Sequence, residues 1–219
     1  ISGYCLPWLW VIFAAAFILG VFDGLWLAPG DYQQGHGYRI MFVHVPAAML
    51  SLGVYCLMAG NALVYLVWKI KLADVIAAVS APLGALFTAL ALLTGALWGK
   101  PMWGTWWVWD ARLTSTLILL FLYLGYLALH ASMDDTRRAD KAGALLVLVG
   151  VVNVPIIYFS VKWWNTLHQG SSISMTAAPK MAQTMLLAML LMTIAFWAYS
   201  FAAIFTRARA LTLDLEHDA

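Results

Sequence analysis

The chain has 219 residues, of which 64% are hydrophobic and only 10% are charged, and its formal net charge is +2. Its mean hydropathy is strongly positive, at +0.85. These values exclude a soluble globular domain and a nucleic-acid-binding protein, and they are typical of an integral membrane protein that has lipid as its surroundings.

Charged residues divide the chain into six uncharged runs, each about as long as or longer than the roughly 20 residues that a helix needs to cross hydrocarbon. The runs are 1–22, 40–68, 75–99, 113–133, 142–161 and 181–206. They predict an all-α, polytopic membrane protein with short connections between its helices. We expect one domain, 1–219, with spans at about 6–27, 40–68, 75–98, 113–133, 142–161 and 181–206.

The first run is too long for the apolar part of a signal peptide, and the "WLAPG" that follows offers no small-x-small cleavage site. We therefore expect it to be a span. Cys5 and Cys56 fall at different depths of the membrane, so they are not expected to form a disulfide. Pro82 and Pro155 are expected to kink the third and fifth spans.

Six spans place both termini on one side of the membrane, with the loops "KIKLAD" and "MDDTRRADK". Seven Lys and Arg residues lie on that side and five on the other. This weak excess favours cytoplasmic termini in a bacterial inner membrane. The other side, expected to be periplasmic, carries the segments after spans 1, 3 and 5.

The segment after span 3, 98–115, holds five tryptophans within twelve residues. An aromatic belt at the membrane boundary needs one or two per helix end, and belt positions are our interpretation of Trp8, Trp10, Trp26, Trp68 and Trp197. Trp103, Trp106, Trp107 and Trp109 exceed that need. A helical or turn-like segment would set Trp106 and Trp109 on one side, forming a surface for a flat apolar ligand.

Two of the five histidines are expected at the same height on the periplasmic side. Measured back from Trp68, the hydrocarbon begins near Met49, so His44 lies about one turn above it. Pro46 restricts the backbone there. His168 follows span 5 by a few residues, beside Trp163 and Trp164. We interpret the remaining histidines, His36, His130 and His217, as structural or solvent-exposed.

Together these residues match the requirements of haem. Its iron takes axial imidazoles, its macrocycle takes aromatic faces, and its propionates take Arg or Lys. The sequence therefore predicts haem held by His44 and His168 beside the tryptophan segment. Asp110 and Arg112 are expected to fix that segment by pairing with each other or with an N–H group. The candidate propionate partners are Arg39, Arg112, Lys100 and Lys162.

Three stretches also resemble a known family. "WGTWWVWDARLTS" (103–115) resembles the tryptophan-rich WWD signature of haem-handling membrane proteins, and "VHVPAAM" (43–49) and "WWNTLHQGS" (163–171) resemble their two histidine motifs. With six spans and this length, nearly the whole chain is similar to the CcmC family of the bacterial cytochrome c maturation system. The CcmF and CcsA-type families share the signature but have many more spans.

The resemblance implies that the chain holds haem b transiently and non-covalently and promotes its transfer to the haem chaperone CcmE. The implied partners are CcmA and CcmB, which form an ABC transporter, and the small protein CcmD. The family's axial histidines correspond to His44 and His168, and its haem platform corresponds to Trp103, Trp106, Trp107, Trp109 and Asp110. The sequence has no P-loop, so we expect ATP hydrolysis to belong to a partner and this chain not to be an enzyme.

Two alternatives remain open. A membrane b-type cytochrome would carry electrons through a permanent bis-histidine haem, but it predicts paired histidines inside facing helices. A quinone-binding or lipid-binding scaffold would use its tryptophans only as membrane anchors, and it predicts no haem spectrum.

Overall fold

The structure is a computed structural model, and it describes residues 2–168 and 181–217. Its described elements are all helical, apart from one isolated bridge between Asp31 and Gly35. The helices are α1 (Ser2–Phe22), η1 (Asp23–Leu27), η2 (Gly37–Ile40), α2 (Met41–Trp68), α3 (Lys71–Trp103), α4 (Ala111–Ser132), α5 (Thr136–Gly150), α6 (Asn153–Trp163) and α7 (Gln183–His217).

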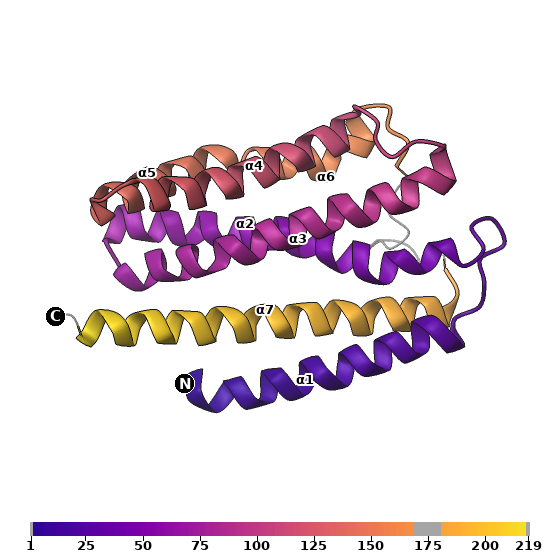
Figure 1. Cartoon of the computed structure of the whole chain (residues 1–219), viewed down its shortest axis with the longest axis horizontal. Coiled ribbons are helices and arrows are strands. Elements are labelled where there is room, and N and C mark those ends of the chain that lie inside the picture. Colours follow the sequence, from indigo (N-terminus) through magenta and orange to yellow (C-terminus); the bar gives the residue numbers. More distant parts are fainter. Residues whose placement is uncertain (1, 169–180, 218–219) are drawn as a thin grey trace.

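Six helical segments are long and apolar enough to cross a membrane, which confirms the predicted class of fold. They are Gly3–Leu27, Gly37–Trp68, Lys71–Trp103, Ala111–Ser132, Thr136–Trp163 and Gln183–Leu213. Consecutive spans run in opposite directions along one bundle (Figure 1). The described residues that follow spans 1, 3 and 5 therefore lie at one end of the bundle. We call it the tryptophan end, because it holds Trp98, Trp103 and Trp109.

The two prolines have different effects on their helices. Span 5 is interrupted between α5 and α6, at Val151 and Val152, and Pro155 lies in the first turn of α6. A proline there has no N–H to donate to the carbonyl four residues earlier, so this span, for which the sequence predicts a kink, is interrupted between α5 and α6. Pro82 lies inside α3, which continues as one helix from Lys71 to Trp103.

The helices pack in three layers (Figure 1). Helices α2 and α3 form the middle layer, α4, α5 and α6 cover one side, and α7 with α1 covers the other. Tyr55 and Tyr123 are fully buried between α2 and α4, edge to face with ring centroids 5.1 Å apart. The Tyr123 hydroxyl donates to the Ser51 carbonyl at 2.7 Å. These contacts fix the rotation of α4 against α2, and with it the positions of residues nearer the tryptophan end.

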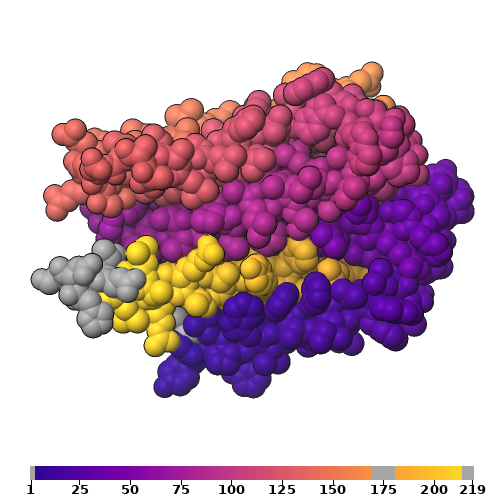
Figure 2. Space-filling view, in the orientation of Figure 1, coloured from indigo at the N-terminus to yellow at the C-terminus, as the bar shows by residue number. Residues whose placement is uncertain are grey.

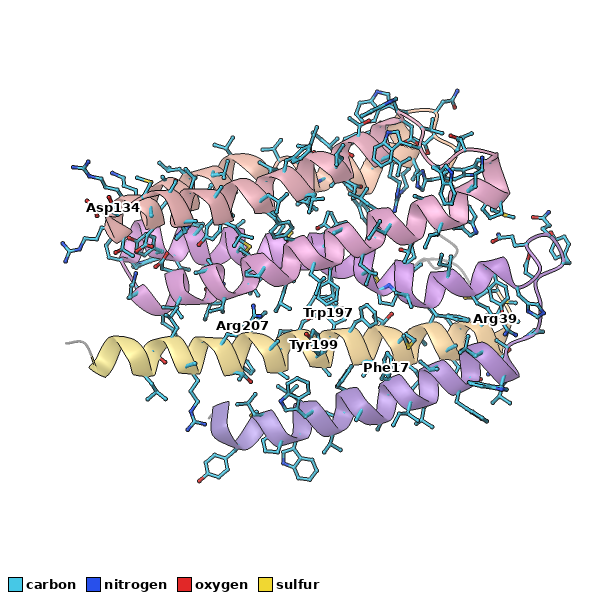
Figure 3. The ribbon with its side chains drawn as sticks, in the orientation of Figure 1. Phe17, Arg39, Asp134, Trp197, Tyr199 and Arg207 are labelled. Atoms are coloured by element: carbon cyan, nitrogen blue, oxygen red, sulfur yellow. The ribbon has the colours of Figure 1, made fainter. Side chains whose placement is uncertain are left out.

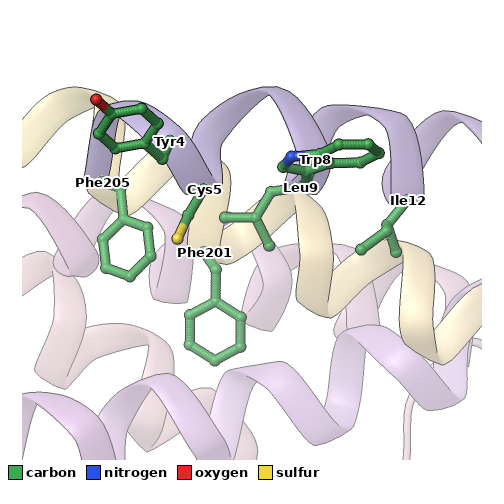
Figure 4. Close-up of a pocket in the computed structure, with 7 residues that line it drawn as sticks. All are labelled: Tyr4, Cys5, Trp8, Leu9, Ile12, Phe201 and Phe205. Atoms are coloured by element: carbon green, nitrogen blue, oxygen red, sulfur yellow. The ribbon is translucent and has the colours of Figure 1, made fainter. Parts of the chain in front are cut away.

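Helix α1 packs along α7 and leaves most of its surface exposed, and Figure 2 shows α7 lying between α1 and the rest of the bundle. An apolar groove of about 660 Å³ opens between these two helices, lined by Trp8, Leu9 and Phe201 among others (Figure 4). This groove lies far along α1 from the tryptophan end. An open, apolar surface on a membrane-spanning helix is where lipid chains are expected to pack.

One tryptophan has a different role from the one predicted. Trp197 lies in the middle of α7, half-buried against the core, and its indole packs where a side chain on Gly53 of α2 would otherwise be (Figure 3). The aromatic-belt interpretation is therefore wrong for Trp197. Trp8, Trp26 and Trp68 are exposed.

Candidate histidine and tryptophan site

The tryptophan-rich segment is part helix and part loop. Helix α3 continues to Trp103 and ends at Gly104, whose φ of 76° is left-handed and therefore favours glycine. Residues 105–110 have no regular helix, so of the two expected conformations, helical and turn-like, the helical one does not occur. Both indoles are nevertheless exposed, at 55% and 75%.

Hydrogen bonds of a threonine hold the loop in shape. The Thr105 hydroxyl donates to the Trp107 carbonyl at 3.0 Å and lies 3.4 Å from the Trp107 amide. Trp107 packs edge to face against Trp109, with centroids 5.4 Å apart. The loop therefore presents Trp106 and Trp109 outward while Trp107 is half-buried behind them.

Trp103 faces inward and contacts a histidine. Its ring lies edge to face with Trp98 at 5.0 Å and with His168 at 4.9 Å. The Trp98 indole N–H donates to the Gln34 side-chain carbonyl at 2.9 Å, which ties the loop after span 1 to the same place. Trp103 thus supports His168 from one side.

Asp110 holds both the start of α4 and the His168 ring. Its Oδ1 accepts a hydrogen bond from the Leu113 amide at 2.7 Å, capping the helix, and its Oδ2 lies 3.3 Å from His168 Nδ1. Because a carboxylate only accepts, His168 donates from Nδ1 and keeps a lone pair on Nε2. Asp110 is buried, with one carboxylate oxygen at the start of α4 and the other at the His168 ring.

The surroundings of His168 favour its neutral form. Burial lowers the pKa of His168 below its ordinary value, the Arg112 guanidinium lowers it further, and the Asp110 carboxylate offsets part of this. A neutral imidazole with its lone pair on Nε2 is the form that binds iron.

His44 reaches the same place from α2. Its Nδ1 lies 3.0 Å from the Thr94 hydroxyl of α3. His44, His168 and Arg112 line one cavity of about 40 Å³, the histidine cavity, which is enclosed mainly by α2, α3 and α4. Pockets for drug-sized ligands measure about 300–1,000 Å³, so in this state the histidine cavity is too small for a porphyrin.

The four candidate cations differ in position. Arg112 lies in the wall of the histidine cavity. Arg39 donates to the Leu25 and Ala28 carbonyls and so fastens the end of span 1. Lys100 donates to the Gly104 carbonyl at 3.1 Å, and Lys162 lies 5.8 Å from the Phe159 ring. Of these four, the structure brings only Arg112 to the two histidines.

The remaining histidines lie elsewhere. His36 is exposed in the loop after span 1, and His130 lies at the opposite end of the bundle beside Asp140. The side chain of His217 is outside the described residues. So are residues 169–171 of the second histidine motif, and the structural account of that motif ends at His168.

Two residues beside His44 were not predicted from the sequence. Thr94 of α3 lies within hydrogen-bond distance of the His44 ring, and the absence of a side chain on Gly95 leaves room for it. The only sequence signal is a polar residue followed by glycine one helical turn before Trp98, within an otherwise apolar run. That pattern is common in membrane helices, so it does not by itself indicate a site.

Comparison with known proteins gives a family match over the whole chain. The family model described as "CcmC: Heme exporter protein C" matches residues 1–219. The chain is 56% identical over 172 residues to the Heme exporter protein C of Escherichia coli strain K12, covering 78% of this chain and 70% of the relative. It is 52% identical over 199 residues to that of Bradyrhizobium diazoefficiens, covering 90% and 74%. A putative cytochrome c biosynthesis ccmC-like mitochondrial protein of Marchantia polymorpha is 49% identical over 172 residues, covering 78% and 69%.

Proposed function

Because the chain belongs to the CcmC, or Heme exporter protein C, family, which handles haem for cytochrome c maturation, we propose that it holds haem between His44 and His168. The observation that carries this proposal is that the two imidazoles line one cavity although they come from distant parts of the chain. Each is held at Nδ1 by a neighbouring side chain, which leaves Nε2 for iron.

Haem binding requires the histidine cavity to widen. His168 lies in residues 164–168, which follow α6 without regular secondary structure, whereas His44 lies in the first turn of α2. The Trp164 amide still donates to the Ser160 carbonyl at the end of α6, but no backbone hydrogen bond ties the described residues 165–168 to that helix. We therefore propose that His168 moves away from His44 with residues 165–168 to admit the ring. Arg112, already in the cavity wall, would then meet a propionate.

The exposed indoles suit a ligand that must be passed on. Trp106 and Trp109 are more than half exposed and offer flat apolar faces next to the histidine cavity, with Trp103 in contact with His168. We propose that part of the porphyrin lies against these indoles with its vinyl edge accessible from outside. A haem that was fully enclosed by protein could not be handed to an acceptor.

We further propose the partners that the family resemblance implies. Haem b would be presented at the periplasmic face of a bacterial inner membrane, with the termini cytoplasmic, and transferred to a CcmE-type chaperone. CcmA, CcmB and CcmD would assemble with this chain. The sequence contains no P-loop, so an ATP-driven change in haem affinity would come from the ABC transporter partners.

The test is a haem titration of the purified protein in lipid nanodiscs, with the Soret and α/β absorption bands recorded. We expect a six-coordinate bis-imidazole spectrum that is lost in His44→Ala and in His168→Ala. His36→Ala is the matched control, because His36 is exposed and lies outside the cavity lining. Unchanged spectra in both cavity variants would disprove axial ligation by these residues. Haem that stays bound after a CcmE-type acceptor and ATP-supplied partners are added would instead favour a b-type cytochrome.

A further inference from the structure

Two consecutive residues of α3 form a support for the His44 ring. The Thr94 hydroxyl oxygen lies 3.0 Å from His44 Nδ1. The next residue is Gly95, where an added Cβ would lie only 3.2 Å from His44 Cε1 and 3.7 Å from Nδ1. The Thr94 hydroxyl therefore lies at hydrogen-bond distance from the ring, and the absence of a side chain on Gly95 leaves room for the ring beside α3.

The hydrogen bonds of Thr94 favour one of the two nitrogens of His44 as the protonated one. A hydroxyl has one proton to donate, and Thr94 donates it to the Leu90 carbonyl at 2.7 Å, within its own helix. The Ala91 carbonyl, at 3.3 Å, is a second acceptor for the same proton. While the hydroxyl proton is donated to one of these carbonyls, the Thr94 oxygen can only accept from His44. His44 Nδ1 is then the donor, and Nε2 keeps the lone pair.

We infer that Thr94 is a positioning residue for the haem-ligating form of His44, with Gly95 providing the space for its ring. The inference rests on the proposed function, since it assigns the support of one of the two proposed iron ligands. Groups that hydrogen-bond the far nitrogen of a metal-ligating histidine fix its tautomer and orientation, and removing them typically weakens metal binding by about 10- to 100-fold.

The support of His44 has a counterpart at His168. Asp110 accepts from His168 Nδ1 at 3.3 Å just as Thr94 accepts from His44 Nδ1. Thr94 lies on α3 and His44 on α2, so the packing of these two helices sets the orientation of the His44 ring. Asp110 lies at the start of α4, so the position of that helix start sets the orientation of the His168 ring. Two independent acceptors thus leave Nε2 as the lone-pair nitrogen on both histidines that line the cavity.

The decisive variant is Thr94→Val, which keeps the shape of the side chain and removes the acceptor. Thr94→Ser restores the hydroxyl. Thr88→Val is the matched control, because Thr88 lies on the same helix, is fully buried and donates to the Gly84 carbonyl at 2.6 Å. No hydrogen bond from Thr88 to a histidine occurs among the described residues, so this control reports the cost of losing a buried hydroxyl alone.

The first measurement uses the protein without haem. In nanodisc samples labelled with ¹⁵N-histidine, the ring nitrogen shifts of His44, assigned by their loss in His44→Ala, distinguish a protonated Nδ1 from a protonated Nε2. We expect protonated Nδ1 in the wild-type chain, Thr94→Ser and Thr88→Val, and a mixture of both forms in Thr94→Val. A protonated Nε2 in the wild-type chain, or an unchanged tautomer in Thr94→Val, would overturn the inference.

The second measurement is haem affinity, with the same four proteins. We expect Thr94→Val to bind haem about 10- to 100-fold more weakly, with Thr94→Ser near wild type. Gly95→Ala, which adds a methyl against the ring, is a second variant in case Thr94→Val fails to fold, and it should also weaken binding. Equal losses of haem affinity in Thr94→Val and Thr88→Val would show that Thr94 contributes only to packing. If His44→Ala leaves haem ligation intact, the proposed function fails, while the haem-free nitrogen shifts still decide the role of Thr94.

Discussion

The two ends of the bundle carry similar residues that are used in opposite ways. At the end opposite the tryptophans, the Lys71 ammonium lies 2.7 Å from both Asp74 and Asp140, and so joins α3 to α5. At the tryptophan end, Asp110 and Arg112 lie near two histidines. At the Lys71 end, ion pairs between opposite charges fasten two helices to each other. At the tryptophan end, polar side chains hold two imidazoles, each by its Nδ1 atom.

Residue type alone would not separate these two clusters. Ligand atoms of Asp74, His130 and Asp140 lie within 4.8 Å of one another, a spacing that would suit a metal ion. However, Lys71 already bonds both carboxylates, and His130 Nε2, the nitrogen turned toward them, lies 3.5 Å from Asp140 Oδ1. The comparison teaches that a candidate ligand is recognised by the hydrogen-bonding capacity that its neighbours leave unused.

The largest expected effect is on stability, at the Lys71 end. Lys71→Met leaves two buried carboxylates without their ammonium partner. Breaking a buried ion pair costs about 3–5 kcal/mol, and we expect about 2 kcal/mol here, because half of the Lys71 side chain reaches solvent. The measurement is thermal unfolding in nanodiscs, and the haem spectrum of the folded fraction should not change.

The control for this prediction is Lys69→Met, which removes an exposed ammonium at the C-cap of α2 that donates to the Leu66 carbonyl of that helix. It should leave the unfolding temperature nearly unchanged. Equal stability of Lys71→Met and the wild-type chain would show that the ion pairs do not fasten α3 to α5. A changed haem spectrum would show that the two ends are coupled.

The next prediction concerns Asp110 at the tryptophan end. Asp110→Asn keeps a helix cap, because asparagine caps almost as well as aspartate, but it replaces the anionic acceptor of His168. We expect roughly tenfold weaker haem binding with little change in stability. Asp110→Ala should in addition lose about 1 kcal/mol of stability, because it removes the cap.

Haem titration and thermal unfolding of both Asp110 variants give the check. If haem affinity falls only in Asp110→Ala, and falls together with the stability of that variant, then Asp110 acts as the cap of α4 and does not position His168. Such a result would make the tryptophan end resemble the Lys71 end, where the aspartates serve packing.

The sequence predicts the six spans because charged residues are confined to their ends, and hydropathy records that directly. It also predicts that the His44 and His168 segments face the same side, because span counting fixes sidedness. The sequence does not predict the side-chain contacts between neighbouring helices. Whether Thr94 faces His44, or Trp197 faces Gly53, depends on how each helix is rotated about its axis, and hydropathy barely differs around helices that are apolar on most sides.

The tryptophan segment is predicted in part. The sequence predicts Trp106 and Trp109 on one side of a helical or turn-like segment, and both are exposed, but it does not predict that Gly104 ends α3 with a left-handed residue and divides the segment into an inward helical pair and an outward loop. The pair is Trp98 and Trp103. Glycine in "WGTW" was the available signal for this division, because a left-handed residue commonly ends a helix.

The smallest expected effect tests whether the outward indoles hold haem at all. In Trp106→Ala and Trp109→Ala, each lost aromatic contact should cost about 0.5–1.5 kcal/mol, or roughly two- to tenfold in haem affinity. Stability should not change, because both side chains are more than half exposed.

Trp8→Ala is the control, since Trp8 is 69% exposed on α1, away from the histidine cavity. Transfer of haem to a CcmE-type acceptor is measured in parallel. We expect transfer to fall more than accumulation in the membrane, because the loop lies outside the packed layers. Loss of accumulation in either loop variant would mean that these indoles support the fold, and the tryptophan end would then have no surface reserved for its ligand.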